Sequence, residues 1–382
     1  MRFWASCFTA RDYANSKHHY AISDQRGTIK TVAFLKQLLD SAGPSGFEQA
    51  PGRVWRKEVE GFADDVRADV HGNSVAVLNP KGKPRVMFAG HIDEIGLQIT
   101  HIDEDGFLYF SGIGGWDSQV LVGQRVLILS RQGPVHGVVG KKAIHQLKKE
   151  ELDRVTKVID LWIDIGAANR DEAAARVRIG DPGVLDSRVE EYPNGRIVSR
   201  SLDNRIGAFV AAEAMRRLAT ARPKHAAVFS VASTREEIAW TGSGARTSAV
   251  GIEPDVAVVV DVTHATDYPG ADKKHSGDHK LGGGVVLSRG SSVSAVVFDL
   301  LVECAEQAKI PYTIQAAPRD TGTDADAIYN AMRGIPTGLV SVPNRYMHSP
   351  NEMVALEDLD RAADLLAEFA RRLAPGIDFI PR

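Results

Sequence analysis

The sequence is poor in cysteine and has no long apolar run. Only two residues of the chain, Cys7 and Cys304, are cysteines, so a framework of disulfide bonds is excluded. Cys304 lies in the apolar pattern FDLLVECAEQA, which indicates a buried thiol and not a nucleophile. No uninterrupted apolar stretch approaches the roughly 18 residues of a membrane-spanning helix. Arg11 and Asp12 interrupt the first segment before a signal-peptide core forms, so we expect a cytoplasmic protein without membrane contact.

The chain also lacks an excess of charge of either sign. Its 46 Lys and Arg residues face 49 Asp and Glu residues, which gives a formal net charge of −3. The basic residues form no dense block, and phosphate binding requires clustered positive charge, so no nucleic-acid partner is expected. We find no internal repeat and no low-complexity tract. With 382 residues, of which 43% are hydrophobic, the chain is large enough for more than one core.

Strand and helix patterns alternate through most of the chain, from RVMFAG to LEDLDRAADLLAEFARRL. This alternation predicts an α/β fold with a mixed, mostly parallel sheet flanked by helices. Residues 97–187 differ, because short β-like pieces such as QRVLILSRQG and ARVRIGDPG are separated by glycines. We therefore expect an N-terminal extension at 1–27, a main α/β domain at 28–96 and 188–382, and an inserted small β-rich domain at 97–187.

Five segments that are far apart in the sequence offer acidic or imidazole side chains at a predicted strand end or on a turn or short loop beside one. The segments GHIDEIG, SLDNRIG, STREEI, VVVDVTH and YMHSPNE contain the candidate residues His91, Asp93, Asp203, Glu236, Glu237, Asp261 and His348. Parallel strands deliver functional side chains at their carboxyl ends, so we expect these residues to converge. Histidine with aspartate and glutamate, without cysteine, is the ligand set of hydrolytic zinc, cobalt or manganese sites.

Most of these candidates also have a structural explanation. His91 has the features of a packing or capping residue, and an aspartate before a helix, as Asp203 is, usually caps that helix. Neighbouring glutamates such as Glu236 are most often solvated, and His348 lies in a polar loop where an exposed histidine needs no function. Asp261 is different, because it follows the near-continuous apolar run VAVVV, where an unpaired carboxylate is costly.

The charges of the candidates fit a pair of metal ions. Two divalent cations carry four positive charges, and Asp203, Glu237 and Asp261 with a bridging hydroxide balance them. Such a pair acidifies water and polarises a carbonyl group. Glu236, left off the metals, is then free to act as the general base. The residues thus predict a two-metal hydrolase.

From about Thr31 to the C-terminal helix, the chain resembles the TET aminopeptidases of metallopeptidase family 42. The insert segments HGVVGKKAIHQL, DLWIDIGA and RIGDPG share this resemblance. It implies a zinc-peptidase-like catalytic domain, short peptides as substrates, and two divalent metal ions per subunit, with zinc expected first and cobalt or manganese as alternatives. It also implies a homo-oligomer in which the inserted domain forms dimer contacts and the dimers build a hollow tetrahedral dodecamer.

The resemblance assigns a role to each matching position. It implies His91 and Asp261 as terminal ligands of one ion, Glu237 and His348 as terminal ligands of the other, Asp203 as the bridge, Asp93 as the residue that orients His91, and Glu236 as the general base. The position of Asp93 supports its role independently, since a carboxylate two residues from a ligating histidine can accept the second ring N–H.

Three features depart from the family pattern. The loop IAWTGSGA is longer than usual and contains Trp240, TGTDADAI carries Asp326 where a small residue is common, and the residues before about Thr28 lie outside the pattern. Both loops are expected near the substrate, so we carry over no side-chain preference. Two interpretations remain open for the basic residues Lys273, Lys274, Lys280 and Arg319. They line a pocket for an acidic side chain, or they are solvated surface residues, which we favour by two to one.

The sequence therefore predicts a dinuclear metal-dependent aminopeptidase that removes N-terminal residues from short peptides. A metal-dependent N-acyl amino acid deacylase remains an alternative, because it would use nearly the same ligands. An inactive, metal-stabilised assembly protein that binds peptides is a second alternative. The intact Glu236 argues against it, since we find no structural partner for this carboxylate. A glycosidase is not supported, because it needs two unligated carboxylates at the scissile bond.

Overall fold

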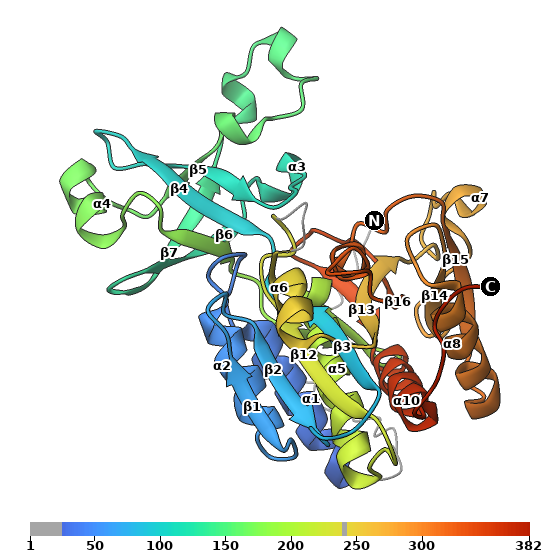
Figure 1. The fold of residues 1–382 in the computed structure, drawn as a ribbon. Helices are drawn as coiled ribbons and strands as arrows, with labels where there is room; N and C mark the ends of the chain where they lie inside the picture. The colour runs from blue at the N-terminus through green and yellow to red at the C-terminus, as the bar shows by residue number, and fades with distance from the viewer. Residues whose placement is uncertain (1–24, 239–242) are drawn as a thin grey trace, which may run out of the picture.

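The structure, a computed structural model, describes residues 25–238 and 243–382. Its larger part is an α/β unit around an eight-stranded sheet (Figure 1). The strands are β1 (Asp65–Ala68), β2 (Ser74–Leu78), β3 (Arg85–His91), β12 (Ala227–Ser233), β13 (Val256–His264), β14 (Val285–Gly290), β15 (Tyr312–Ala317) and β16 (Thr337–Asn344). Their order in the sheet is β1-β2-β12-β3-β13-β16-β14-β15. The central strands β12, β3, β13 and β16 are parallel, whereas β2 and β14 run antiparallel to this group.

Helices cover both faces of this sheet. Alternate residues of a strand point to opposite faces, so Phe88 of β3 packs into one core while Met87 and Ala89 pack into the other. The helices that contribute to the larger core are α1 (Gln25–Asp40), α2 (Gln49–Val59), α5 (Leu202–Thr220), α8 (Ala295–Ala308) and α10 (Leu356–Arg372). The smaller core is covered by α6 (Ser243–Ile252) and α9 (Asp324–Tyr329). The predicted mixed sheet flanked by helices is confirmed.

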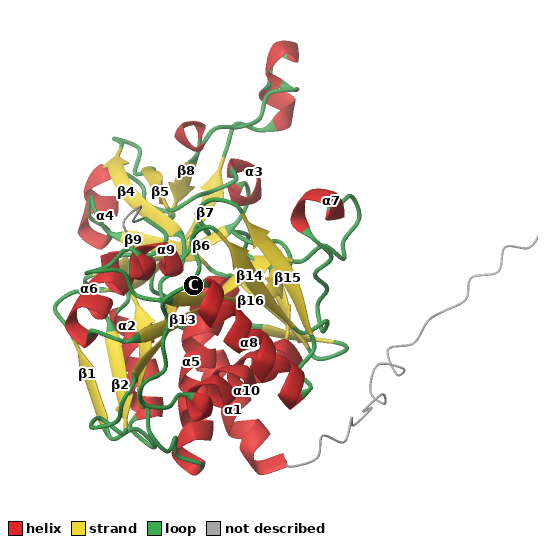
Figure 2. Ribbon diagram, turned by 45° about the vertical axis from the view of Figure 1, so that its right-hand side comes forward, coloured by secondary structure: helices red, strands yellow, loops and turns green. Residues whose placement is uncertain are grey.

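A separate β-barrel is inserted after β3 and stands away from the α/β unit (Figures 1 and 2). Its strands are β4 (Gly96–Ile102), β5 (Leu108–Ile113), β6 (Arg125–Ser130), β7 (Gly133–Gly140), β8 (Trp162–Asp164) and β9 (Pro182–Leu185), with α3 (Ser118–Leu121) and α4 (Arg170–Arg176) between them. Each neighbouring pair is antiparallel, and the barrel closes in the order β4-β5-β8-β7-β6-β9. The expectation of a β-rich insert is confirmed.

Two details of the insert differ from the sequence prediction. The segment ARVRIGDPG is not one β-like piece, because its first residues finish α4 and its last residues begin β9. The side chain of Asn169 accepts the N–H of Glu172 and thereby starts this helix. Between β7 and β8 the chain leaves the barrel through the short 3₁₀ helices η1 (Ile144–Gln146), η2 (Lys149–Glu151) and η3 (Val158–Asp160). We call residues 141–160 the protruding segment; it lies at the far tip of the molecule in Figure 1.

A small sheet of three strands joins distant parts of the chain beside the main sheet. It consists of β10 (Glu190–Tyr192), β11 (Arg196–Ser199) and β17 (Glu352–Ala355). The short helix α7 (Lys273–Ser276) lies in the connection between β13 and β14. The pairing of Ser199 with Glu352 brings the start of α5 next to the loop after β16. The sequence did not predict this sheet, because its strands are only three or four residues long.

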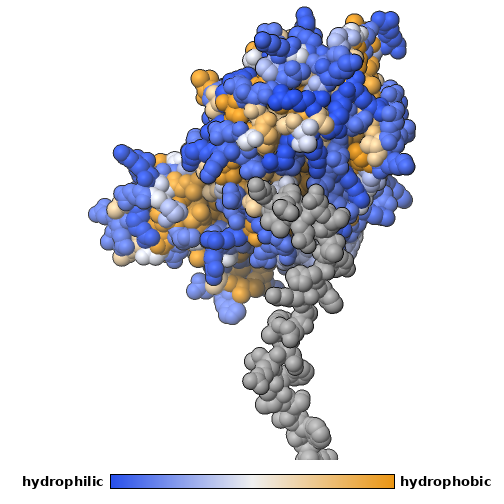
Figure 3. Space-filling view, turned by 90° about the horizontal axis from the view of Figure 1, so that it is seen from below, coloured by the Kyte–Doolittle hydropathy of each residue, from blue (hydrophilic) through white to orange (hydrophobic). Residues whose placement is uncertain are grey.

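In the view of Figure 3, the surface is mostly hydrophilic with separate apolar patches, as is usual for a folded chain. No helix among residues 25–238 and 243–382 has the length and apolar character needed to cross a bilayer. The expected extension at 1–27 lies largely outside the described residues, and α1 already begins at Gln25. Trp240 and Cys7 also lie outside them.

Candidate metal centre

The seven residues singled out in the sequence lie together at the carboxyl ends of the central strands. Parallel pairing in register places Ser233, the last residue of β12, opposite His91, the last residue of β3. The glutamates Glu236 and Glu237 follow β12, Asp261 lies near the end of β13, Asp203 lies in the first turn of α5, and His348 lies in the loop between β16 and β17. Five distant segments therefore meet at one edge of the sheet.

Two glycines allow the first turn of α5 to approach the strands closely. A Cβ atom on Gly90 would lie 2.2 Å from the carbonyl carbon of Gly207, and a Cβ atom on Gly207 would lie 2.4 Å from the carbonyl oxygen of Val260. Any side chain at either position would therefore push α5 away from β3 and β13. The glycines of the segments GHIDEIG and SLDNRIG thus place Asp203 between His91 and Asp261.

The first group of potential ligands consists of His91, Asp203 and Asp261. The Nε2 atom of His91 lies 3.2 Å from Oδ1 of Asp203 and 4.0 Å from Oδ1 of Asp261. One atom from each of the three side chains lies within 4.8 Å of the others, and all three residues are buried. A single cation between these atoms would have two carboxylates and one imidazole as ligands.

The second group consists of Asp203, Glu237 and His348. The Nε2 atom of His348 lies 3.3 Å from Oδ2 of Asp203 and 3.3 Å from Oε2 of Glu237. Asp203 therefore presents Oδ1 to the first group and Oδ2 to the second. This arrangement is the one required of a bridging carboxylate.

Glu236 and Asp93 flank the first group. The Oε2 atom of Glu236 lies 3.7 Å from Nε2 of His91, and Oδ1 of Asp93 lies 3.4 Å from Nδ1 on the other side of the same ring. Asp93 also accepts the backbone N–H groups of Glu236 and Glu237, each at 3.2 Å, and the hydroxyl of Ser45. Asp93 thus lies against the histidine ring and holds the turn that carries both glutamates.

Burial and mutual charge shift the pKa values of these groups. Burial by itself disfavours the charged form of His91, but the carboxylates of Glu236, Asp203 and Asp93 outweigh it and raise the pKa of His91 well above its ordinary value. Burial raises the pKa of Glu236 to about 10, with help from neighbouring acids and against the opposing effect of His91. Burial also raises the pKa of Asp261 well above its ordinary value. Acids in such proximity hold protons unless cations neutralise them.

The cluster therefore fits divalent metal ions. The Oε1 atom of Glu237 is buried and has no hydrogen-bond partner among the described residues. Imidazole nitrogen and carboxylate oxygen are the donor atoms of zinc, cobalt and manganese sites. A cation takes the place of the protons on its ligands, which relieves the repulsion among the buried acids.

Three further carboxylates near the cluster were not assigned a role from the sequence. Glu94 forms ion pairs with the buried Arg205 and Arg200 at 2.8 and 2.9 Å, and Arg205 donates to the carbonyl oxygen of Ile92. Glu352 accepts backbone N–H groups from two of the ligand segments. Glu94 and Glu352 both lie in the motif segments, but only the tertiary contacts show what they bind.

The third unassigned carboxylate is Asp324, in the segment TGTDADAI. It is buried and accepts the hydroxyl of Ser233 at 2.5 Å, and burial raises its pKa to about 6. Asp326 instead accepts the N–H groups of Thr321 and Gly322 in its own turn. The unusual residue noted in the sequence therefore stabilises the loop, and its neighbour Asp324 lies against the strand that leads to the glutamates.

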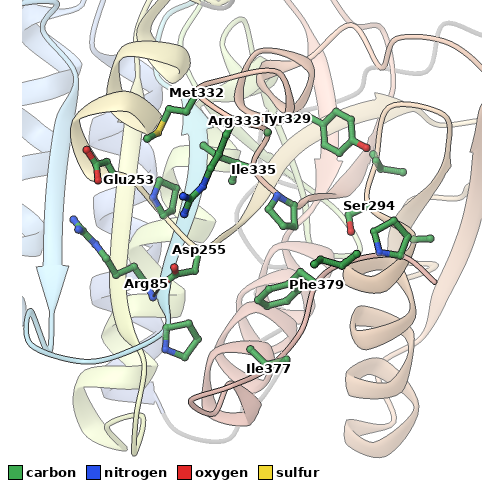
Figure 4. Close-up of a pocket in the computed structure, with 18 of the residues that line it drawn as sticks. Arg85, Glu253, Asp255, Ser294, Tyr329, Met332, Arg333, Ile335, Ile377 and Phe379 are labelled. Atoms are coloured by element: carbon green, nitrogen blue, oxygen red, sulfur yellow. Dashed lines mark hydrogen bonds between the residues drawn. The ribbon is translucent and has the colours of Figure 1, made fainter.

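A cavity of about 310 Å³ is lined by Val262, Thr263, Gln315, Arg319 and Thr323 among others, and Val262 directly follows Asp261 in the chain. A cavity of about 1230 Å³ lies at the amino ends of the strands, where Arg85, Asp255, Tyr329 and Phe379 line it (Figure 4). The larger cavity is remote from the cluster, so its size does not identify the functional site.

The four basic residues noted in the sequence have different surroundings. Lys273 and Lys280 are about half exposed and both face Asp278, at 2.8 and 3.7 Å. Arg319 lines the smaller cavity, whereas none of the three lysines is among its lining residues. A lysine-lined pocket for an acidic side chain is therefore not formed at this cavity.

Comparisons with known proteins identify the family of this chain. The family model described as M42 glutamyl aminopeptidase matches residues 72–365. The lysyl aminopeptidase of Pyrococcus furiosus is 33% identical over 351 residues, which cover 91% of this chain and 98% of that protein. A TET aminopeptidase from the marine sediment archaeon Thaumarchaeota archaeon SCGC AB-539-E09 superposes with a TM-score of 0.87 and 34% identity, covering 91% of this chain and 98% of the other. The TET1 peptidase of Pyrococcus horikoshii, which can assemble into a tetrahedron or a large octahedral shell, superposes with a TM-score of 0.79 and 30% identity, covering 90% of this chain and all of the other. The chain therefore belongs to the M42 family of metal-dependent peptidases.

Proposed function

We propose that the protein is a dinuclear metal-dependent aminopeptidase that removes N-terminal residues from short peptides. The observation that carries this proposal is the position of Asp203, whose two oxygens face two separate groups of ligands. His91 and Asp261 would complete one site, and Glu237 and His348 the other. When bound, a pair of divalent cations acidifies the attacking water and polarises the scissile carbonyl group.

Glu236 is the general base of this mechanism. Its carboxylate lies 3.7 Å from His91 and remains after the other acids have been assigned to the metal ions. Its side chain is 16% exposed, more than those of Asp203 and Asp261, so a water molecule can reach it. Glu236 takes the proton from the attacking water and returns it to the leaving amine.

Zinc is the proposed native metal, with cobalt and manganese as the alternatives, because the ligand set accepts all three. The cavity of about 310 Å³, whose lining includes Val262 directly after Asp261, would receive the side chain of the N-terminal residue. Its lining combines the hydroxyls of Thr263 and Thr323 with the guanidinium of Arg319 and the carboxylate of Asp320. This mixture selects no single charge, so the preferred residue is left to experiment.

The inserted domain at 97–187 is proposed to form dimer contacts, while 28–96 and 188–382 form the catalytic domain. Several apolar side chains of the protruding segment are exposed, namely Ile144 (63%), Val155 (61%) and Ile159 (81%). Exposed apolar side chains gathered on one segment mark a surface that pairs with another protein. A second copy of this chain is the proposed occupant. The likeness to TET1, which can assemble into a tetrahedron, supports the proposal of a tetrahedral assembly built from dimers.

The function can be tested with metal-free protein, Zn²⁺, Co²⁺ or Mn²⁺, and amide substrates that carry N-terminal Leu, Glu, Lys or Ala. Each substrate is offered with a free and with an acetylated amino group. Metal-dependent cleavage of the free-amine substrates supports the aminopeptidase and identifies its preference. Release of acetate without cleavage of free-amine substrates would show a deacylase. No turnover in any combination would indicate an inactive assembly protein.

A further inference from the structure

Glu352 connects two residues of the proposed metal centre without being one of its ligands. It begins β17 and is 1% exposed. Its Oε2 atom accepts the backbone N–H of Asp203 at 2.9 Å, and its Oε1 atom accepts the backbone N–H of His348 at 2.8 Å. The side chains of these two residues face each other at 3.3 Å. One carboxylate therefore fixes the main chain on both sides of the second ligand group.

The main chain needs such support at both places. His348 has a φ of +59°, in the left-handed region that is unfavourable for a residue with a side chain. Asp203 has φ −79° and ψ 109°, so it departs from helical geometry inside the first turn of α5. Pairing between β11 and β17 fixes the position of Glu352 relative to both segments, with Ser199 opposite it.

We propose that Glu352 is a positioning residue for one of the two metal ions, the ion held by Asp203, Glu237 and His348. This inference rests on the proposed function and deepens it. Neither hydrogen bond of Glu352 reaches His91 or Asp261, the other two terminal positions. Both hydrogen bonds of Glu352 hold ligands of the second ion, whereas Asp203 alone links Glu352 to the first, so loss of Glu352 weakens the second ion more than the first.

The chemical requirement is for two acceptors on one rigid side chain. A carboxylate offers both oxygens to N–H donors, whereas a glutamine offers one oxygen and directs an NH₂ group at the other donor. The Glu352→Gln substitution keeps the size of the side chain and removes one of the two hydrogen bonds. Changes in the partners that orient metal ligands typically cost about 10- to 100-fold in metal affinity.

The test is a Co²⁺ titration of the full-length, metal-free protein. Calorimetry measures the binding of each ion, and the visible absorption of bound Co²⁺ reports its site. For Glu352→Gln, we expect the Co²⁺ ion at Asp203, Glu237 and His348 to bind about 10- to 100-fold more weakly, while the other ion loses less affinity. At limiting Co²⁺, the absorption spectrum of Glu352→Gln should lack the same component as the spectrum of His348→Ala. A Glu352→Asp variant, which keeps the charge but is too short to reach both N–H groups, should show the same selective weakening.

Asp358 provides a matched control. It is also fully buried and accepts two backbone N–H groups, those of Gly282 at 2.6 Å and Gly284 at 2.9 Å, but it touches none of the proposed ligands. Asp358→Asn should change thermal stability without changing either Co²⁺ affinity. A similar loss of one ion in Asp358→Asn and Glu352→Gln would show that the effect is general destabilisation, and the inference would be wrong.

Other outcomes separate this inference from the proposed function. If the wild-type chain binds two Co²⁺ ions and Glu352→Gln binds both with unchanged affinity, the positioning role is wrong while the metal centre stands. Equal weakening of both ions would also refute it, because the role is specific to one side. If the wild-type chain binds no Co²⁺, the proposed metal centre and this inference fail together.

Discussion

The carboxyl end of the main sheet and the inserted barrel place polar and apolar groups in opposite ways. At the sheet end, charged side chains such as Asp203, Asp261 and Glu352 are almost completely buried. In the inserted domain, the core is formed by apolar side chains, with Asp181 as a buried charged residue, while the protruding segment exposes isoleucines to the surface. One region has buried charged groups that fit metal ions, and the other has exposed apolar groups that we propose to contact a second copy of the chain.

This difference indicates that electrostatic interactions dominate the sheet end and that apolar burial dominates the barrel. Buried carboxylates repel one another and are costly without partners, so the sheet end is stabilised when cations bind. The barrel needs no ligand, because its apolar core supplies the stability of the insert. We therefore expect changes at the sheet end to affect metal binding and catalysis, and changes on the barrel to affect folding or assembly. Four experiments test this division.

Removal of metal should have the largest effect. Treatment with a chelator should abolish peptidase activity, and Zn²⁺, Co²⁺ or Mn²⁺ should restore it. The melting temperature should fall as well, because an ion present at 1,000 times its dissociation constant contributes about 4 kcal/mol to stability. Metal analysis alongside calorimetry checks this. Full activity after complete loss of metal would contradict the proposed mechanism.

Replacement of the general base should have the next largest effect. Glu236→Gln should lower kcat by about 10²- to 10⁴-fold, the range of a lost acid–base group, and should leave two metal ions bound. Asp203→Ala should instead release metal, since the shared carboxylate is removed from both groups. Kinetics combined with metal content distinguishes the two roles. Full turnover by Glu236→Gln would remove this residue from the mechanism.

The apolar core of the barrel can be tested with a pair of isoleucines. Ile163 is 0% exposed and Ile179 is 65% exposed in the same domain. Ile163→Ala should lower the free energy of unfolding by about 2–5 kcal/mol, because it leaves a cavity in the core. Ile179→Ala should change it by less than about 0.5 kcal/mol. Urea unfolding measures both, and equal values would show that burial in this domain does not determine stability.

The protruding segment should affect assembly more than stability. Glutamate at both Ile144 and Ile159 places charges on the proposed contact surface, so the oligomer should dissociate into smaller species. The melting temperature of the separated chains should change by only a few degrees, since both side chains are exposed. Sedimentation velocity measures the species, with Ile179→Glu as the control. An unchanged assembly would place the interface elsewhere.

Much of the fold follows from local patterns. Apolar runs such as VAVVV in β13 and the amphipathic pattern of α10 coincide with the observed elements, because burial on one or both faces fixes which residues are apolar. The strands of the small sheet could not be predicted in this way. They are three or four residues long, and β10 has no buried residue, so neither periodicity nor composition marks them.

The candidate site shows the same division at the level of single residues. Asp261 was predicted because a carboxylate after an apolar run is costly, His91 because Asp93 lies two residues on, and Asp203 because a carboxylate at the start of a helix can bind two cations. Asp324 was not found, and Asp326 drew attention in its place, because both look alike in the sequence TGTDADAI. The direction of each side chain depends on α9 and on Ser233, which is 91 positions away in the chain.

The sequence by itself determined the class of fold, the kind of donor atoms and the segments that carry them, since these depend on residue type and short-range pattern. Only the tertiary structure decided which oxygen of Asp203 faces which histidine. It also decided that Glu352 accepts the backbone N–H groups of both Asp203 and His348. The reason is physical. Asp203 lies more than 100 positions from His91, His348 and Glu352, and the geometry of its contacts depends on sheet register and on the close approach of two glycines, which no local pattern specifies.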